Sequence, residues 1–259
     1  MPFRTVQSLK YYEFQSFQRD ELRHGIFSRH GGVSGVPWDS LNVGASVGDN
    51  IALVGENKQR IFESLGLTTQ QSFEVWQVHS DQVIHSSAPL NGRKLQKADA
   101  IITAVANVAL FMRFADCVPI LFYDPEMRVI AIAHAGWKGT VAKIAAKVVA
   151  EMINGFDCKP ENILTAIGPS ICVDHYEVGE DVSLAVRKSF GSSADEVLLW
   201  QDKAHLDLWL ANANTLKSVG IQQVELARKC TVCNNEDWFS HRYEQGLTGR
   251  FGALICMVE

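Results

Sequence analysis

The sequence predicts a mixed α/β fold in a single domain spanning residues 1–259, with a sheet-rich core flanked by helices. Short, β-branched apolar runs fill the middle of the chain, at 98–104, 108–114, 118–123 and 129–133. After residue 134, apolar positions at helical spacing alternate with short strand-like runs. We find no linker, repeat or low-complexity segment, and one large α/β domain accounts for a chain of 259 residues.

The other elements follow from apolar periodicity and from turn residues. In the N-terminal half we expect a strand at 24–29, a glycine-rich turn at 30–35, a helix at 51–65, and strands at 73–78 and 82–85. The helix should end at Gly66, because glycine readily adopts the left-handed conformation that closes helices. In the C-terminal half we expect a helix with an apolar face from Val141 to Met152, a strand at 162–167, helices at 177–190 and 206–219, and strands at 224–227 and 252–258.

A hairpin in the middle of the chain carries the strongest candidate for a functional site. The runs at 118–123 and 129–133 flank a turn that begins with Asp and Pro. If the hairpin closes around Pro125-Glu126, Cys117 lies opposite His134. Directly opposed residues have Cβ atoms about 4.5–5.5 Å apart, which lets a thiolate and an imidazole bind one zinc ion.

Two considerations bear on that pairing. A bulge or a longer loop would shift the register, and Pro119 indicates an edge strand or an irregular strand start. Each residue alone also has a purely structural interpretation. A lone Cys in an apolar strand is usually a small buried hydrophobe, and a lone His at a strand end usually belongs to the core or its rim.

His79, in the segment W-Q-V-H-S, is the third candidate metal ligand. Catalytic zinc sites use three protein ligands and leave the fourth position for water or substrate, and His79, Cys117 and His134 fit that number. They lie on separate segments, so no spacing signature links them. We assign no ligand role to the remaining histidines, which are His24, His30, His85, His175, His205 and His241.

Two further segments are candidates for anion binding. Gly136-Trp137-Lys138-Gly139 lies where a strand passes into a helix, so backbone N–H groups and Lys138 are available to an anion. The alternative interpretation is that these glycines only permit a tight turn from strand to helix. Arg29, beside Gly31-Gly32, is either a bidentate phosphate ligand or an ordinary surface ion-pair residue.

Composition and cysteine usage narrow the class of protein. A net charge of −5 argues against a nucleic-acid partner, and no apolar run is long enough to span a membrane. Six cysteines without an export signal indicate reduced thiols in a cytoplasmic protein. Cys230-x-x-Cys233 has no second Cys pair at zinc-ribbon spacing, so we interpret it as incidental, together with Cys158 and Cys172.

In combination, these motifs are similar to those of the YfiH or laccase-domain family. The matching blocks run in order from about residue 24 to residue 259: S-R-H-G-G-V-S (28–34), S-L-N (40–42), Q-V-H (77–79), A-D-A (98–100), A-D-C-V-P-I-L (115–121), H-A-G-W-K-G (134–139), I-G-P-S-I-C-V-D-H-Y-E-V-G (167–179), C-T (230–231), F-S-H-R (239–242) and T-G-R (248–250). The resemblance implies a single α/β domain related to cysteine-hydrolase-like folds, with zinc held by His79, Cys117 and His134. Lys138 departs from the Arg that many members carry.

The resemblance also implies an activity. Members are regarded as purine nucleoside phosphorylases acting on adenosine, inosine, guanosine and methylthioadenosine, with a further adenosine deaminase activity. Zinc would lower the pKa of water to about 7 for attack on adenine. Arg29, Lys138 and the backbone from Gly136 would hold phosphate, and Asn42 would contact ribose or base. We treat Asp116 as structural. The expected partners are purine nucleosides and phosphate, and the chain is expected to be a monomer or a homodimer.

Three alternatives stay open at this point. Cys117 with a His base would suit a metal-free amidase that edits peptidoglycan precursors. A copper-dependent polyphenol oxidase is less favoured, because eight scattered histidines without H-x-H pairs do not supply several copper sites. A non-catalytic metal-binding protein would have every metal position filled by protein.

Overall fold

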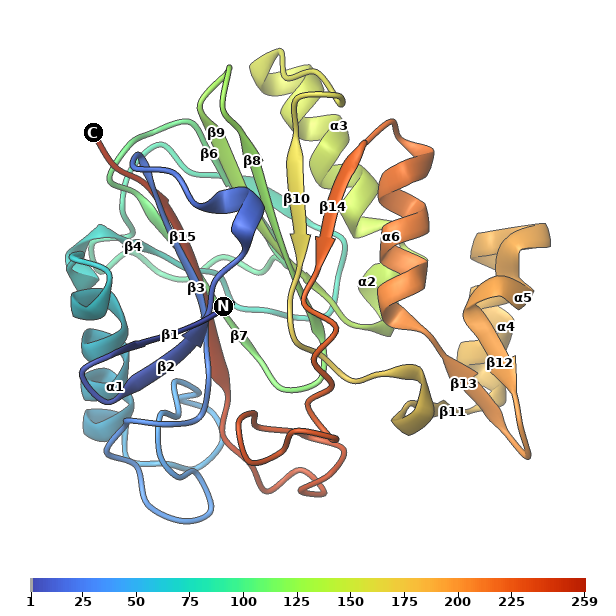
Figure 1. Cartoon of the computed structure of the whole chain (residues 1–259), viewed down its shortest axis with the longest axis horizontal. Helices are drawn as coiled ribbons and strands as arrows, with labels where there is room; N and C mark the ends of the chain where they lie inside the picture. The colour runs from blue at the N-terminus through green and yellow to red at the C-terminus, as the bar shows by residue number, and fades with distance from the viewer. Residues whose placement is uncertain (1) are drawn as a thin grey trace.

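Two six-stranded sheets form the centre of the computed structural model, which describes residues 2–259 (Figure 1). The first sheet has the order β1 (Phe3–Val6), β2 (Leu9–Tyr12), β3 (Leu22–Phe27), β15 (Phe251–Met257), β7 (Ala109–Phe114) and β4 (Ser72–Phe73). The second has the order β14 (Gln223–Leu226), β10 (Leu164–Ile167), β8 (Val118–Asp124), β9 (Val129–Ala135), β6 (Ala100–Thr103) and β5 (Val83–His85). Both mix parallel and antiparallel pairs.

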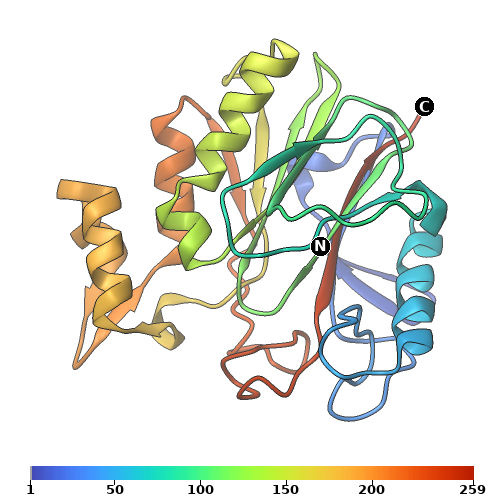
Figure 2. The same cartoon turned by 180° about the vertical axis from the view of Figure 1, so that it is seen from behind.

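The two sheets pack face to face, and helices cover their outer faces (Figures 1 and 2). In β8, Leu121 and Tyr123 face the first sheet, whereas Ile120 and Phe122 face helices. This alternation buries every residue of β8 and β9, as the unbroken apolar runs predict. The mixed α/β fold with a sheet-rich core is therefore confirmed.

Six α-helices are present in the described part of the chain: α1 (Ile51–Ser64), α2 (Trp137–Val141), α3 (Ile144–Phe156), α4 (Glu180–Phe190), α5 (Ala194–Val197) and α6 (Leu208–Ser218). α1 covers the first sheet, while α3 and α6 cover the second. A small third sheet lies beside α4 and α5, in the order β11 (Glu177–Val178), β13 (Ala204–Leu206) and β12 (Leu198–Trp200). Short 3-10 turns occupy Gln15–Phe17, Thr69–Gln71, Val173–His175 and Gly191–Ser193.

The predicted register of the central hairpin is wrong by two residues. Asp124 pairs with Val129, so the loop holds residues 125–128 rather than two residues. The Asp124 carboxylate accepts hydrogen bonds from the N–H groups of Glu126 and Met127, and Arg128 adopts a left-handed φ of 51°. Pro119, not Cys117, therefore lies opposite His134. A shift of two preserves the faces of a strand, so Cys117 stays on the His134 side as a diagonal neighbour.

Several boundaries also differ from expectation. β8 is an interior strand, so Pro119 does not mark an edge; it is the second residue of the strand. The strand expected at 73–78 shortens to β4, and the helix expected from Val141 divides at Lys143, which has a φ of 58°. The helix expected at 177–190 begins only at Glu180, after β11. Sequence periodicity alone gave no indication of β1, β2, β12, β13 or α5.

Among residues 2–259, no helix combines the length and the apolar character that crossing a membrane requires.

Candidate metal centre

His79, Cys117 and His134 come together at one end of the second sheet. Their ligand atoms all lie within 4.8 Å of one another. His79 lies in the loop between β4 and β5, Cys117 directly precedes β8, and His134 is the sixth residue of β9. The group runs from the buried ring of His134 to the exposed ring of His79. The structure thus brings together the three residues that the sequence singles out as ligands.

A buried carboxylate that the sequence analysis missed, Asp99, holds two of these segments in place. Asp99 is fully buried and directly precedes β6. Its two oxygens accept hydrogen bonds from the backbone N–H groups of Val78, His79 and Ser80, at 3.2, 3.0 and 2.6 Å. His79 itself has a left-handed φ of 58°, a conformation that costs energy unless its surroundings fix it. The three hydrogen bonds to Asp99 hold His79 in this conformation.

Asp99 also orients the second histidine. Oδ1 of Asp99 lies 2.8 Å from Nδ1 of His134. The centroid of the His134 ring lies 5.5 Å from that of the Phe114 ring. Burial would raise the pKa of Asp99, but the hydrogen bonds from His134 and Ser80 outweigh it and lower that pKa to about 2. Because Nδ1 is engaged, Nε2 is the ring nitrogen left for a metal. Carboxylate–histidine pairs of this kind fix the orientation of metal-binding imidazoles.

Cys117 is poised to ionise. Burial opposes the thiolate, yet the charges and hydrogen bonds of His134 and His79 lower the pKa of Cys117 to about 6. Burial likewise opposes a charged His134, but the Cys117 thiolate and the Asp99 carboxylate raise the pKa of His134 to about 9. Two imidazoles and a thiolate grouped in this way have the donor chemistry of a zinc site, so the residues fit the ion.

Gly136 lies directly against the cluster. A Cβ atom at this position would be 2.8 Å from the sulfur of Cys117 and 3.3 Å from Cδ2 of His79. Its φ is −71°, which any residue adopts, so the close approach and not the backbone conformation requires glycine here. Lys138, two residues on, is exposed on α2 and lies 5.6 Å above the ring of Trp137.

Asp116 connects the cluster to two distant loops. It has a φ of 79°, and its carboxylate accepts hydrogen bonds of 2.6 Å from the hydroxyl of Thr231 and from the N–H of Arg242. Its carbonyl oxygen accepts another from the N–H of Ile171 at 3.0 Å. These contacts agree with the structural role expected for Asp116, and they place the long segment 227–250 beside Cys117.

The charge of Cys117 acts on Arg250 and Tyr176, and sequence reasoning assigned neither residue a role. Burial lowers the pKa of Arg250, against the opposing charges of Cys117, Asp116 and Glu244. Burial, followed by the charge of Cys117, raises the pKa of Tyr176. The signal for both lay in the blocks I-G-P-S-I-C-V-D-H-Y-E-V-G and T-G-R, which matched the family without indicating a chemical role.

Arg29 is engaged within the protein. Its Nε donates to the Asp39 carbonyl at 2.9 Å, and its Nη1 donates to the Asn235 carbonyl and to Glu244, both at 3.0 Å. The guanidinium also lies 4.5 Å above the ring of Phe239. These contacts match the ion-pair interpretation, in a mostly buried rather than a surface position. A contact of Arg29 with phosphate stays a prediction.

Asn42 is fully buried inside a loop network. Its Oδ1 accepts from the N–H groups of Gly44 and Arg250, at 2.9 and 2.8 Å, and its Nδ2 donates to Asp49 at 2.8 Å. Asn42 thereby holds the backbone of Arg250 in place. Its contact with ribose or base stays a prediction.

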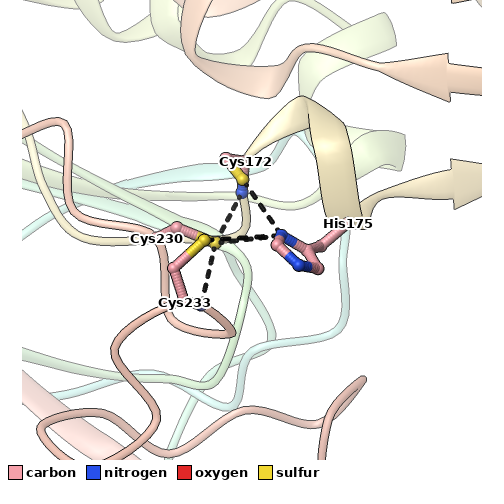
Figure 3. Close-up of side chains that lie close together, drawn as sticks. All are labelled: Cys172, His175, Cys230 and Cys233. Atoms are coloured by element: carbon pink, nitrogen blue, oxygen red, sulfur yellow. Dashed lines mark hydrogen bonds between the residues drawn. The ribbon is translucent and has the colours of Figure 1, made fainter.

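The cysteines interpreted as incidental are neighbours, apart from Cys158. Cys172, His175, Cys230 and Cys233 form a second cluster of potential ligands, also within 4.8 Å of one another (Figure 3). The structure thus brings together three cysteines that the sequence analysis interprets as incidental and one histidine, His175, to which it assigns no ligand role. The sequence signal was a second pair at the same spacing, Cys172-x-x-His175, which contains a histidine instead of a second cysteine.

The fold and the site define a class: a two-sheet α/β protein with a His–Cys–His cluster beside a buried carboxylate. The chain belongs to the family described as multi-copper polyphenol oxidoreductase laccase, whose model matches residues 23–258. It is 38% identical over 232 residues to a purine nucleoside phosphorylase of Deinococcus radiodurans, covering 90% of this chain and 88% of that protein. It is 34% identical to the purine nucleoside phosphorylase YlmD of Bacillus subtilis, covering 92% and 90%.

Solved structures agree with this assignment. The crystal structure of YlmD from Geobacillus stearothermophilus has a TM-score of 0.93 at 30% identity, covering 100% of this chain and 99% of that one. That of the Bacillus licheniformis hypothetical protein YfiH has a TM-score of 0.92 at 32% identity, covering 99% of both chains. The predicted resemblance to the YfiH or laccase-domain family is confirmed.

Proposed function

We propose that this protein is a zinc-dependent purine nucleoside phosphorylase. The observation that carries the proposal is the cluster of His79, Cys117 and His134, which is buried at one end and exposed at the other. Three protein ligands with access to the surface are typical of catalytic rather than structural zinc sites. The names of the relatives, purine nucleoside phosphorylase in two organisms, supply the substrate class.

The metal would be held by His79, Cys117 and His134. When bound, zinc supplies Lewis-acid chemistry beside the substrate. Asp99 keeps Nδ1 of His134 engaged and so presents Nε2 to the metal. Gly136 leaves room beside the sulfur of Cys117. Copper accepts the same ligand types and is the less favoured metal, because one thiolate and two imidazoles do not make a multi-copper set.

Phosphorolysis requires phosphate beside the ribose. A phosphate oxygen forms a bond to C1′ while the bond from C1′ to the purine nitrogen breaks, and its electron pair leaves with the base, which takes up a proton. Lys138, exposed on α2, and Arg250 are the cations that we propose to hold the phosphate. Nη1 of Arg250 donates to the carbonyl oxygens of Thr248 and Gly249, at 3.1 and 2.8 Å, so the rest of its guanidinium would face the phosphate. Arg29 and Asn42 would contact substrate only by exchanging internal hydrogen bonds; their present contacts support positioning roles.

The decisive experiment is product analysis on purified protein of known metal content. With adenosine and phosphate, we expect adenine and ribose-1-phosphate in equal amounts, with inosine, guanosine and methylthioadenosine as further substrates. Without phosphate, the deaminase activity would give inosine from adenosine. If inosine forms at the same rate with and without phosphate and no adenine appears, the protein has the deaminase activity but not the phosphorylase activity.

Cys117→Ala tests whether the cluster carries the reaction. We expect this variant to stay folded and to lose both zinc at this cluster and nucleoside turnover, because the thiolate is one of only three proposed ligands. Metal content, circular dichroism and product formation are the measurements. Cys158→Ser, a cysteine outside both clusters, is the matched control and should keep full activity. Turnover retained in metal-free Cys117→Ala protein would exclude the zinc mechanism.

One observation favours a second candidate function. A thiol with a pKa lowered to about 6 beside an imidazole also describes a cysteine nucleophile with its base. Such a pair would suit an amidase acting on peptidoglycan precursors without a metal. Protein stripped of zinc separates the two functions, because the amidase activity would persist and the phosphorylase activity would be lost.

Two other outcomes would support other functions. Phenol oxidation that depends on added copper would support the oxidase, and bound zinc without any turnover would support a non-catalytic metal-binding protein.

A further inference from the structure

The second cluster joins two segments that are far apart in the chain. Cys172 directly precedes the 3-10 turn Val173–His175, which follows β10, and His175 is the last residue of that turn; Cys230 and Cys233 follow β14. Nδ1 of His175 lies 3.3 Å from the sulfur of Cys172, 3.9 Å from that of Cys230 and 3.5 Å from that of Cys233 (Figure 3). All four ligand atoms lie within 4.8 Å of one another.

Hydrogen bonding does not account for this arrangement. One imidazole nitrogen either accepts a single hydrogen bond or donates one. Three sulfur atoms around the same Nδ1 therefore exceed its capacity by two. Thiols are also weak hydrogen-bond formers, so they have little reason to gather around one nitrogen. A group placed between the four atoms would satisfy them all at once.

The distances match those of a tetrahedral metal site. With Zn–S of about 2.3 Å and Zn–N of about 2.0–2.1 Å, a tetrahedral angle places sulfur about 3.6 Å from nitrogen. The observed separations of 3.3–3.9 Å bracket that value. Three thiolates and one imidazole form one of the established ligand sets of structural zinc.

The local backbone is also arranged for thiolate ligands. Each pair has two intervening residues, Cys172-x-x-His175 and Cys230-x-x-Cys233, which is a ligand spacing typical of zinc sites. The N–H groups of Cys172 and Cys233 point at the sulfur of Cys230, at 3.3 and 3.5 Å. Such bonds stabilise the charged form of a sulfur that binds a metal. Cys230 is buried, whereas Cys233 and His175 are exposed, so an ion can enter from the surface.

We propose that Cys172, His175, Cys230 and Cys233 form a second, structural zinc site. All four positions around the ion are filled by protein, so the site is closed to substrate. Its ligand set shares no residue with His79, Cys117 and His134, and the inference stands whether or not the chain turns over nucleosides.

The proposed ion would hold together two segments of the chain that lie beside the first cluster. It ties the segment after β10 to the segment 227–250, which contains neither helix nor strand. Next to these ligands, Thr231 and Arg242 bind the carboxylate of Asp116, the neighbour of Cys117. Nη1 of Arg242 also donates to the His175 carbonyl at 3.3 Å. Loss of the ion should therefore loosen Thr231 and Arg242 and, through Asp116, the position of Cys117.

The experiment measures metal content and ligand type in the Cys117→Ala background, where the first site is disabled. After purification without chelators, we expect about one zinc per chain. Cys117→Ala/Cys233→Ser should lose that zinc, and Cys117→Ala/Cys158→Ser should keep it. Replacing the zinc by Co²⁺ should give thiolate-to-metal charge-transfer absorption of about three times the intensity expected of a one-thiolate site.

A conservative variant tests whether zinc is lost because a ligand is missing or because the protein has unfolded. Cys117→Ala/Cys233→His keeps four ligands and should retain the metal, with the charge-transfer absorption reduced to about two thirds. Zinc removal by a chelator should lower the melting temperature of the Cys117→Ala protein and leave that of Cys117→Ala/Cys233→Ser unchanged. Folded Cys117→Ala protein that binds neither zinc nor Co²⁺, or that contains a disulfide between two of these cysteines, overturns the proposal.

Discussion

At the scale of single residues, Asp99 determines the geometry of the candidate site. One fully buried carboxylate binds three consecutive N–H groups around His79 and the ring of His134, so it sets the positions of two proposed ligands together. Sequence alone could not assign this role. Asp99 precedes His134 by 35 residues and follows His79 by 20. The pairing of β6 with β9 brings Asp99 to His134, and the parallel pairing of β5 with β6 brings the loop that holds His79 to Asp99.

Asp99→Asn should weaken the site without unfolding the protein. Asparagine keeps one acceptor oxygen but loses the negative charge beside the His134 ring. Replacing a residue that hydrogen-bonds to a metal ligand typically lowers metal affinity or activity by about 10–100-fold. Zinc affinity, measured by competition with a chelator, and kcat at saturating metal are the readouts. Asp81→Asn is the matched control, because Asp81 is a partly exposed carboxylate on the same loop whose partner is Lys147. Equal effects of both changes would remove the special role of Asp99.

At the scale of elements, the central hairpin shows how far periodicity reaches. Both strands, their burial on both faces and their turn follow from the sequence, but the register does not. The loop is two residues longer than predicted because the Asp124 side chain caps the N–H groups of Glu126 and Met127, and because Arg128 takes a left-handed conformation. Apolar alternation repeats every two residues, so it cannot distinguish registers that differ by two.

The junction of β9 and α2 gives a prediction at the same scale. Gly136→Ala should displace Cys117, because the new Cβ would be 2.8 Å from its sulfur. We expect loss of zinc from the first site and at least a tenfold loss of turnover, with the second cluster still loaded. Gly55→Ala serves as the control: that glycine lies in α1 with open space around it, so alanine should stabilise the protein by about 0.5–1 kcal/mol. Unchanged metal content in Gly136→Ala protein would contradict the steric argument.

At the scale of the whole molecule, one buried histidine links folding to pH. His24 is 2% exposed in β3, and its Nε2 accepts a hydrogen bond from the N–H of Phe14 at 2.9 Å. Burial, aided by the charge of Arg4, lowers the pKa of His24 from 6.5 to about 3. Protonation therefore favours the unfolded chain. The stability that His24 contributes is fully present above pH 6.5 and is lost as the pH falls toward 3.

Between pH 7 and pH 5, protonation of His24 should reduce the free energy of unfolding by about 2 kcal/mol. Urea unfolding at both pH values measures this difference. His24→Gln, whose amide oxygen accepts the same hydrogen bond but does not titrate, should show a correspondingly smaller loss over that range. Since the other titrating groups are shared, identical losses in the two proteins would exclude His24 as the source.

The whole molecule also explains what the sequence could and could not predict about the site. Cys117 and His134 were recognisable because one hairpin brings them near each other, and His79 was added because a catalytic zinc site needs a third protein ligand. Cys172 and Cys230 are 58 residues apart and meet only because β10 and β14 run side by side in parallel. Local pattern shows two pairs at the same spacing, Cys172-x-x-His175 and Cys230-x-x-Cys233, but carries no information that the two pairs meet.

The place of β15 has a consequence for synthesis. This strand, Phe251–Met257, lies between β3 and β7, so it fills the interior of a sheet whose other strands are made earlier. Until residue 257 has left the ribosome, β3 and β7 present open edges, and segment 227–250 has no second anchor. The nascent chain thus carries all seven metal-ligand candidates before it has the strand that fixes their surroundings. Closure of the first sheet is therefore a late step of folding, and the surroundings of both clusters are complete only after it.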